Sequence, residues 1–353
     1  MSDEIQAKQS LDNIIRKARV HLYKPIQVAE ILHRDRVFQD IDLSKLDTYR
    51  NASKRWRDEV CLTFLGRIST SSARYQDDLF NENATPPEIL CELGKINRAS
   101  GGVVEAYIYR KFSQRLSQVS IGLDYCQNHD HKSFRLEDFL GLFWNEPGLR
   151  RSIDKVYEII VYGLFSALVD ALDVRVSISM DASQADVFAE FEDFARQVVQ
   201  LTPQQPRLEL KAKIYRVGVT NAADRGLDMW ANFGLAVQVK HLSLTEELAE
   251  NIVAPVSSDR IVIVCKDAEE RVIVSLLNQM GWKSRIQSVV TESHLITWYE
   301  KALRGQFATT VGANLLATVE REIKAEFPSS DSSGLLAFMQ KRGYSTLHQV
   351  DWC

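Results

Sequence analysis

Residues 224–240 read Asp-Arg-Gly-Leu-Asp-Met-Trp-Ala-Asn-Phe-Gly-Leu-Ala-Val-Gln-Val-Lys, and this stretch decides the fold. Two short runs of strand-forming residues, 227–230 and 235–240, flank a turn at 231–234. Gly234 stands where a hairpin turn needs a residue that tolerates positive φ. The stretch therefore predicts a β-hairpin.

The hairpin would gather polar side chains at one edge of a sheet. Side chains alternate between faces along a strand, so Gln238 and Lys240 point the same way, and the hairpin folds Asp228 back beside them. Carboxylate and carboxamide oxygens can bind Mg²⁺, and a lysine can orient an attacking water during phosphodiester hydrolysis. Alternatively, Asp228 is an ordinary turn residue and Lys240 is an ordinary solvent-exposed lysine at the end of a strand.

The region around the hairpin, from about Leu149 onward, alternates between helix and strand patterns. Residues 261–265 form an apolar, mostly β-branched run, which is typical of a central strand covered on both faces. We expect helices at 152–172, 185–201, 244–253 and 268–280, and further strands at 174–180, 211–220, 260–265 and 285–290. This order predicts an α/β core with a mixed sheet.

The region before Leu149 reads as mostly helical, with expected helices at 5–20, 25–36, 53–65, 87–96 and 103–124. The second and third of these could form a helix-turn-helix-like reader of DNA, although a plain helical bundle has the same pattern. We therefore expect two regions, residues 1–148 and residues 149–353.

Charge is uneven along a chain whose formal net charge is −4. Residues 16–36 and 50–74 each hold six Lys or Arg against two acidic residues, so each stretch carries +4. Local clusters of this kind are what phosphate binding requires. A solvated helix face explains them equally well.

Other features narrow the class of protein. There is no apolar run of membrane-spanning length, and the polar start Met-Ser-Asp-Glu is unlike a signal peptide. The five cysteines, at positions 61, 91, 126, 265 and 353, form no C-x-x-C pair. This scatter argues against a disulfide framework or zinc ribbon and favours a reducing cytoplasm. No G-x-x-x-x-G-K-[ST] motif is present, so nucleotide hydrolysis is not indicated.

A weaker hint of metal binding is His129-x-His131 beside Cys126. Zinc or an HNH-type nuclease site would need a second pair of ligands at a suitable spacing, which the sequence lacks. A solvent-exposed loop is the favoured interpretation.

The hairpin residues resemble a known nuclease motif. Asp-x9-Gln-x-Lys across a hairpin resembles the PD-(D/E)xK nuclease superfamily, in the Gln-for-Glu form of Mrr-type restriction nucleases. Longer phrases resemble the HaeII family of type II restriction endonucleases: residues 21–27 (HLYKPIQ), 54–58 (KRWRD), 66–72 (GRISTSS), 219–228 (VTNAADRGLD) and 298–305 (WYEKALRG). The resemblance covers nearly the whole chain and weakens after about Phe307.

The resemblance implies a catalytic and metal-binding site. Asp228 would be the metal carboxylate, Gln238 would take the position usually held by Glu or Asp, and Lys240 would be the catalytic lysine; Val239 is expected in the metal site too. Because a carboxamide carries no charge, the site should bind Mg²⁺ more weakly. Glu158, the only acidic residue between Lys155 and Val169 of an otherwise apolar helix, is the candidate second carboxylate, with Asp224 in reserve; a buried ion pair explains Glu158 equally well.

The resemblance also implies a PD-(D/E)xK core in residues 149–353 and a DNA clamp in residues 1–148. The expected partners are double-stranded DNA, cleaved at the palindrome R-G-C-G-C-Y, a second copy of the chain in a homodimer, and a cognate DNA methyltransferase. The expected DNA contacts are Lys54, Arg55, Arg57, Arg67, Asn221 and Arg225. Some of these cations could instead pair with Asp58 and Glu59.

Two other functions fit the same residues. A repair or junction nuclease of the same superfamily would tolerate many DNA sequences. A sequence-specific DNA-binding protein without catalysis would have no need for both Asp228 and Lys240.

Overall fold

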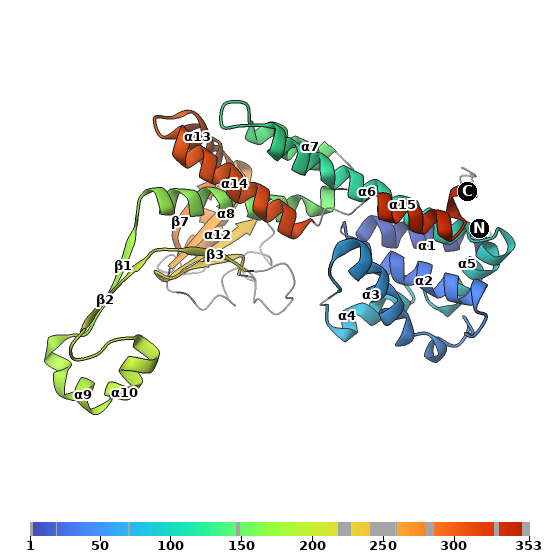
Figure 1. Ribbon diagram of the computed structural model, residues 1–353, viewed down its shortest axis with the longest axis horizontal. Coiled ribbons are helices and arrows are strands. Elements are labelled where there is room, and N and C mark those ends of the chain that lie inside the picture. The colour runs from blue at the N-terminus through green and yellow to red at the C-terminus, as the bar shows by residue number, and fades with distance from the viewer. Residues whose placement is uncertain are drawn as a thin grey trace. The chain divides into compact units, whose positions relative to one another are not determined.

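The structure is a computed structural model, which describes residues 3–18, 20–69, 71–145, 149–217, 227–240, 258, 260–279, 286–327 and 332–347 (Figure 1). These residues form two compact units. The helical unit contains the described residues up to 159 and from 319 onward, and the sheet unit contains those between 160 and 318. No helix in the described residues is long and apolar enough to cross a membrane.

The helical unit is a bundle, as the sequence predicts for this region. Its helices are α1 (Asp3–Lys17), α2 (Tyr23–Val37), α3 (Ala52–Leu65), α4 (Ala73–Asp77), α5 (Pro87–Ala99), α6 (Val103–Asn128), α7 (Leu136–Asn145) and α15 (Ser332–Lys341). Short 3₁₀ turns lie at Leu46–Thr48, Asp78–Phe80, Arg150–Ser152 and Tyr344–Thr346. Helix α2 packs against α1, α3, α5 and α6.

This packing decides between the two interpretations of α2 and α3. The 14 residues 38–51 separate them, whereas a helix-turn-helix joins its helices by a turn of about 3–4 residues. Most of α2 is buried by its neighbours in the bundle. The helix-turn-helix interpretation is therefore wrong for this pair, and the plain bundle is confirmed.

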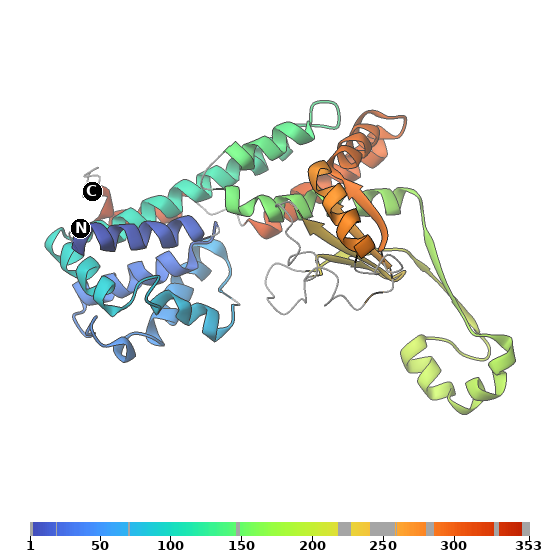
Figure 2. The same cartoon turned by 180° about the vertical axis from the view of Figure 1, so that it is seen from behind.

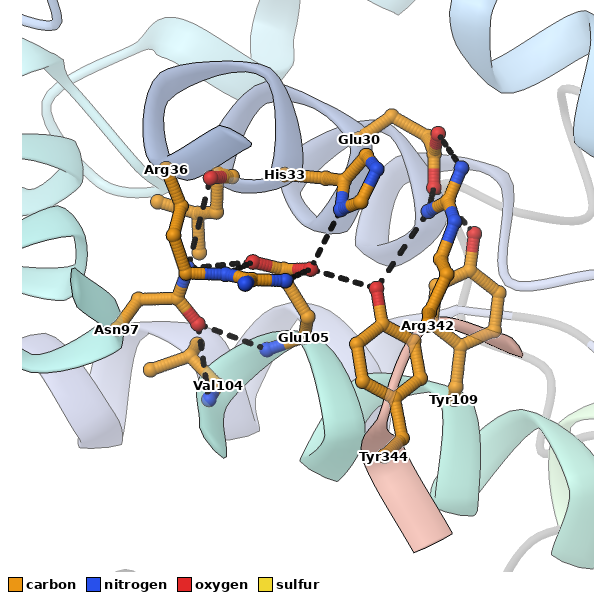
Figure 3. A network of polar contacts seen from close by, with 10 residues as sticks. Glu30, His33, Arg36, Asn97, Val104, Glu105, Tyr109, Arg342 and Tyr344 are labelled. Carbon is orange, nitrogen blue, oxygen red and sulfur yellow. Dashed lines mark hydrogen bonds and ion pairs between the residues drawn. The ribbon is translucent and has the colours of Figure 1, made fainter. Parts of the chain in front are cut away.

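A buried carboxylate, Glu105 of α6, joins α2, α5 and the C-terminal segment (Figure 3). Its oxygens accept two bonds from the Arg36 guanidinium, at 2.8 and 3.0 Å, and one from Asn97 at 2.6 Å. They also contact His33 and the Tyr344 hydroxyl. Burial alone would raise the pKa of Glu105, but these hydrogen bonds together lower it to about 2.

A second ion pair lies beside the first and attaches the segment directly after α15 to α2 (Figure 3). Arg342 donates to both oxygens of Glu30, at 2.6 and 2.9 Å, and the Tyr109 hydroxyl donates to the same carboxylate. Segments more than 300 residues apart in the sequence are therefore held together by two adjacent carboxylates.

Replacing Glu105 by Gln should destabilise the helical unit. Loss of the charge leaves Arg36 without its ion partner, and a carboxyl pKa lowered from 4.5 to about 2 corresponds to roughly 3 kcal/mol of stability. A carboxyl group whose pKa is lowered by folding stabilises the folded state at pH values above its pKa in the unfolded chain. The difference in unfolding free energy between wild type and E105Q should therefore be complete at pH 7. Urea unfolding should show this difference shrink as the pH falls from about 4.5 toward 2.

The control is Glu92→Gln, which breaks a solvent-facing pair with Lys95 and should cost well under 1 kcal/mol. Equal unfolding midpoints for E105Q and wild type at pH 7 would contradict the assignment of Glu105 as a stabilising charge.

The sheet unit contains two separate sheets. Strands β3 (Ile214–Arg216), β4 (Met229–Ala231), β5 (Leu235–Lys240), β6 (Arg260–Cys265) and β7 (Ile286–Thr291) lie side by side in that order. Strands β3, β4 and β5 pair antiparallel, whereas β5, β6 and β7 pair parallel. Strands β1 (Arg175–Ser179) and β2 (Arg207–Lys211) form an antiparallel ribbon of their own (Figures 1 and 2).

The helices of this part of the chain are α8 (Ile153–Ala171), α9 (Ala185–Glu190), α10 (Glu192–Phe194), α12 (Asp267–Gln279), α13 (Glu292–Arg304) and α14 (Ala308–Glu326). A 3₁₀ turn lies at Ala182–Gln184 and a π-helical turn at Ala195–Val199. Helices α8 and α13 contact each other, because the Tyr299 hydroxyl donates to the Ile160 carbonyl at 2.9 Å. Helices α8 and α14 contribute residues to both units.

The sheet bears out most of the sequence predictions. It is mixed, as expected; residues 261–265 are all buried in β6, and Gly234 has φ 82° in the hairpin turn. The strand predicted at 174–180 is confirmed as β1, although it pairs outside the main sheet. Two expectations were wrong: the helix at 185–201 is interrupted near Phe191, and the strand at 211–220 is divided, because Lys211 ends β2 whereas Ile214–Arg216 forms β3 of the other sheet. The expected helix 244–253 lies outside the described residues, as does the end of the expected strand 211–220.

Candidate active site

The β4–β5 hairpin places Asp228 beside Gln238. Met229 pairs with Val237 and Trp230 with Ala236. Asp228 precedes and Gln238 follows the Met229–Val237 pair, so alternation along the two strands places both side chains on one face. The Asp228 backbone N–H donates to the Val237 carbonyl at 3.3 Å. Its carboxylate accepts the Val239 N–H at 2.8 Å. The carboxylate is thereby held at the carboxyl end of β5.

Gln238 is a carboxamide in an apolar environment. It is 0% exposed, and neither its Oε1 nor its Nε2 has a hydrogen-bond partner among the described residues. Its strand neighbours on that face are the buried Ala236, Ile261 and Ile263. An unsatisfied buried amide costs about 1–3 kcal/mol, so packing alone does not explain a glutamine at this position.

Lys240 completes the group at the same edge. It ends β5, lies two residues beyond Gln238 on the same face, and is half-buried opposite Cys265 of β6. The structure therefore brings together a carboxylate, a carboxamide and an ammonium group, as the sequence predicts. Val239 can offer only its backbone carbonyl oxygen.

The donor set fits a hard cation in part. Within the described ranges, no group of three or more His, Cys, Asp and Glu side chains could hold a metal ion. Asp228 and Gln238 nevertheless supply oxygen donors, the ligand type of Mg²⁺, and the unsatisfied Gln238 oxygen agrees with such a role.

Glu158, the expected second carboxylate, has a cation beside it. It is buried on α8, and the Lys155 ammonium contacts both of its oxygens, at 2.8 and 2.7 Å. Glu158 belongs to the helical unit, whereas Asp228, Gln238 and Lys240 belong to the sheet unit. The reserve candidate Asp224 lies outside the described residues, as do the expected DNA contacts Asn221 and Arg225.

The four N-terminal cations have different environments. Arg57 is only 1% exposed and donates to Asp58 and to Gln27, while Lys54 pairs with Asp77 at 2.8 Å. The Arg67 guanidinium donates to backbone carbonyls at the end of α14. Arg55 is exposed on α3, with its side chain in contact with solvent.

The three N-terminal phrases that carried the resemblance meet around Arg57. Gln27, from the first phrase, is fully buried and donates to Ser53 at 2.9 Å while accepting from Arg57 at 3.0 Å. Arg57 also donates to Gln76, whose amide group donates to the Ser71 carbonyl at 2.6 Å. The sequence could not separate this internal role of Arg57 from a DNA contact, because both use an arginine on an amphipathic helix.

One feature near the site escaped the sequence analysis. Tyr215 and Trp230 are direct cross-strand partners whose rings stack at 4.4 Å with an interplanar angle of 22°. Both are partly exposed, and they share the face of Asp228 and Gln238. Their alternation in the strand patterns was visible, but the pairing of β3 with β4 was not.

The zinc hint at His129 and His131 finds no support in the described residues. The His129 ring stacks on Tyr125 at 3.9 Å and bonds to the Tyr125 carbonyl, and His131 is half-buried. Burial raises the pKa of the Cys126 thiol to about 12, which disfavours the thiolate that zinc binds.

Comparison with known proteins gives a consistent result. Residues 7–344 match the HaeII restriction endonuclease family. The chain is 60% identical over 351 residues to the type II restriction enzyme HaeII of Haemophilus aegyptius, covering 99% of this chain and 100% of that one. It is also 60% identical over 343 residues to the type II restriction enzyme NgoBI of Neisseria gonorrhoeae, covering 97% of each. No solved structure matches.

Substituting Gln238 by Leu should leave the protein as stable as wild type or more stable. The substitution removes a buried amide that has no partner among the described residues, and an apolar side chain of similar size loses no hydrogen bond. The matched control is Gln27→Leu, equally buried but bonded through both amide atoms, which should cost about 2 kcal/mol or more. Thermal unfolding compares the two; equal destabilisation would mean that Gln238 has a structural partner.

Proposed function

Because the chain belongs to the HaeII restriction endonuclease family and is a type II restriction enzyme, we propose that Asp228, Gln238 and Lys240 form its phosphodiester-hydrolysing site. The observation that carries the proposal is the convergence of these three side chains on one face at the end of β5. The family membership excludes a repair nuclease and a non-catalytic DNA-binding protein.

The proposed fold of the catalytic core is of the PD-(D/E)xK type. Support comes from the mixed sheet, in which an antiparallel hairpin carrying the aspartate is followed by parallel strands. The parallel strand β6 buries the edge of β5 and so fixes the orientation of Gln238 and Lys240.

Hydrolysis requires a water oxygen to form a bond to phosphorus while one P–O ester bond breaks, and negative charge grows on the phosphoryl oxygens. The Lys240 ammonium can donate hydrogen bonds to the attacking water and to a phosphoryl oxygen, which lowers the energy of the charged transition state. Its half-buried position limits competing hydration.

The proposed cofactor is Mg²⁺. The Asp228 carboxylate, the Gln238 Oε1 and the Val239 carbonyl oxygen would hold it, all three from the sheet unit. A bound Mg²⁺ polarises the phosphoryl group and lowers the pKa of a coordinated water. The Asp228–Val239 hydrogen bond would orient the carboxylate for this role.

The substrate is DNA, and we propose cleavage of both strands at the palindrome R-G-C-G-C-Y by a homodimer. Exposed Arg55 is the best-supported N-terminal DNA contact, with Lys54 and Arg67 able to contribute if they leave their present partners. Buried Arg57 would act by positioning α3. Asn221 and Arg225, next to the catalytic hairpin in sequence, stay proposed contacts.

We also propose a bacterial cytoplasmic setting, since both relatives are bacterial enzymes and the described cysteines are free thiols. A cognate DNA methyltransferase must then protect the host genome at the same sequence.

Lys240→Ala should abolish cleavage and leave DNA affinity within a few fold. The lysine acts on the transition state more than on bound substrate, and removing such a group costs about 10²–10³-fold or more in rate. Single-turnover cleavage of a plasmid with Mg²⁺ gives the rate, and gel shift without Mg²⁺ gives the affinity. Lys213→Ala, an exposed lysine on the same unit, is the control; near wild-type cleavage by K240A would remove Lys240 from the mechanism.

Gln238→Glu should give an enzyme that reaches half-maximal rate at lower Mg²⁺ concentration. Glutamate keeps the oxygen and adds a negative charge beside Asp228, and a hard cation gains from each added carboxylate. A titration of cleavage rate against Mg²⁺ compares Q238E, Q238L and wild type. Q238L lacks the side-chain oxygen and should be inactive at every Mg²⁺ concentration. If Q238E is equally inactive, Gln238 acts through its NH₂ group and is not a metal ligand.

A further inference from the structure

Residues 175–211 form a distinct substructure that the catalytic site does not use. We call them the arm: the ribbon β1–β2, and the tip, residues 181–200, which contains α9, α10 and the π-helical turn (Figures 1 and 2). The Ala212 N–H donates to the Val174 carbonyl at 2.9 Å and closes the base of the arm. Within the described residues, the extensive contacts of the arm elements are with one another.

The tip exposes four large apolar side chains. Val187 lies on α9, Phe191 directly follows that helix, Phe194 ends α10 and Val198 lies in the π-helical turn. They are 53%, 54%, 56% and 65% exposed. Two adjacent phenylalanines exposed to this degree mark an interaction surface rather than scattered surface apolar residues.

The ribbon also has an apolar face. The register pairs Val176 with Leu210 and Ile178 with Leu208, so these four side chains lie on one side and are only partly buried. An isolated two-stranded ribbon is marginally stable in water unless its apolar face is covered. Both halves of the arm therefore have apolar surface that lacks a cover among the described residues.

The two halves carry opposite charge. The tip holds five carboxylates against Arg196, a formal net charge of −4, whereas the strands hold Arg175, Arg207 and Lys211 against Glu209, a net charge of +2. The arm thus offers two apolar surfaces, one bordered by acidic residues at the tip and one bordered by basic residues on the ribbon, and these opposite charges attract each other.

We propose that the arm joins two copies of this chain: the tip of each copy packs on the ribbon of the other. The arrangement is self-complementary, as a two-fold interface requires, because tip meets ribbon and ribbon meets tip. It rests on the proposed function, since a chain with one catalytic group needs a second copy to cut both strands. It also places the acidic tip against the basic ribbon.

The size of the surface agrees with a dimer. The two phenylalanines offer about 100 Å² each, and the aliphatic residues of tip and ribbon raise the apolar area to the order of several hundred Å² per copy. A stable interface buries on the order of 800 Å² per partner, which the apolar area and the polar residues around it can together provide.

DNA is a poor occupant of the tip. Its net charge of −4 in 20 residues would repel phosphates, whereas DNA-binding surfaces carry an excess of cations. The ribbon of a second copy offers both the positive charge and the apolar face that the tip requires.

The test compares Phe191→Ser/Phe194→Ser with wild type by sedimentation equilibrium at several concentrations without DNA. Both side chains are exposed, so the variant should fold, which circular dichroism and thermal unfolding check. We expect wild type to be a dimer and the variant's dissociation constant to rise about 100-fold or more. Phe307→Ser, at a phenylalanine outside the arm that is also mostly exposed, should stay dimeric.

A monomeric wild type, or a double variant that dimerises as tightly as wild type, would overturn the proposal. A variant that stays dimeric but binds DNA more weakly would assign the arm to DNA instead. Failure of the proposed function is separate: a wild-type protein that dimerises through the arm yet cuts no DNA with Mg²⁺ would refute the catalytic assignment alone. Replacing residues 175–211 by two glycines, across the Val174–Ala212 closure, repeats the test without the arm.

Discussion

The hydrogen bond from the Val239 N–H to the Asp228 carboxylate is the constraint on which the proposed catalytic site depends. It ties the side chain that opens the hairpin to the backbone between Gln238 and Lys240. The antiparallel register alone would leave the Asp228 rotamer undetermined, and the bond selects one that lies over the end of β5. Parallel pairing with β6 then fixes β5 itself, so the strand pairing holds three chemically different groups at one edge of the sheet.

This arrangement has an energetic consequence in the sheet. Gln238 lies among apolar residues of β5 and β6 without a hydrogen-bond partner in the described part of the chain, a cost of about 1–3 kcal/mol. Gln27, equally buried, is satisfied at both amide atoms. On the proposed function, the contrast separates a glutamine that serves the fold from one that serves chemistry, and such local destabilisation is typical of functional sites.

The sequence predicted what is local and missed what is distant. The hairpin followed from the turn at Gly234, and the buried strand β6 from its apolar run, because both signals lie within about ten residues. The partner of β1 lies some thirty residues away, and nothing in the alternation of 174–180 distinguishes a ribbon from an edge of the main sheet. Likewise, an amphipathic pattern places Arg57 on a helix but does not reveal that Gln27 and Gln76 surround it.

The distribution of charge bears on how an acidic chain can bind DNA. The net charge of the whole chain is −4, and the tip alone carries −4, so the remainder is formally neutral. Within that remainder the positive stretches 16–36 and 50–74 are partly neutralised internally, by Glu105 for Arg36 and by Asp58 for Arg57. The cations left to meet phosphates are therefore fewer than the sequence suggests. A surface with few cations gains little from charge alone, and in the proposed homodimer two copies on one duplex would each add their own contacts.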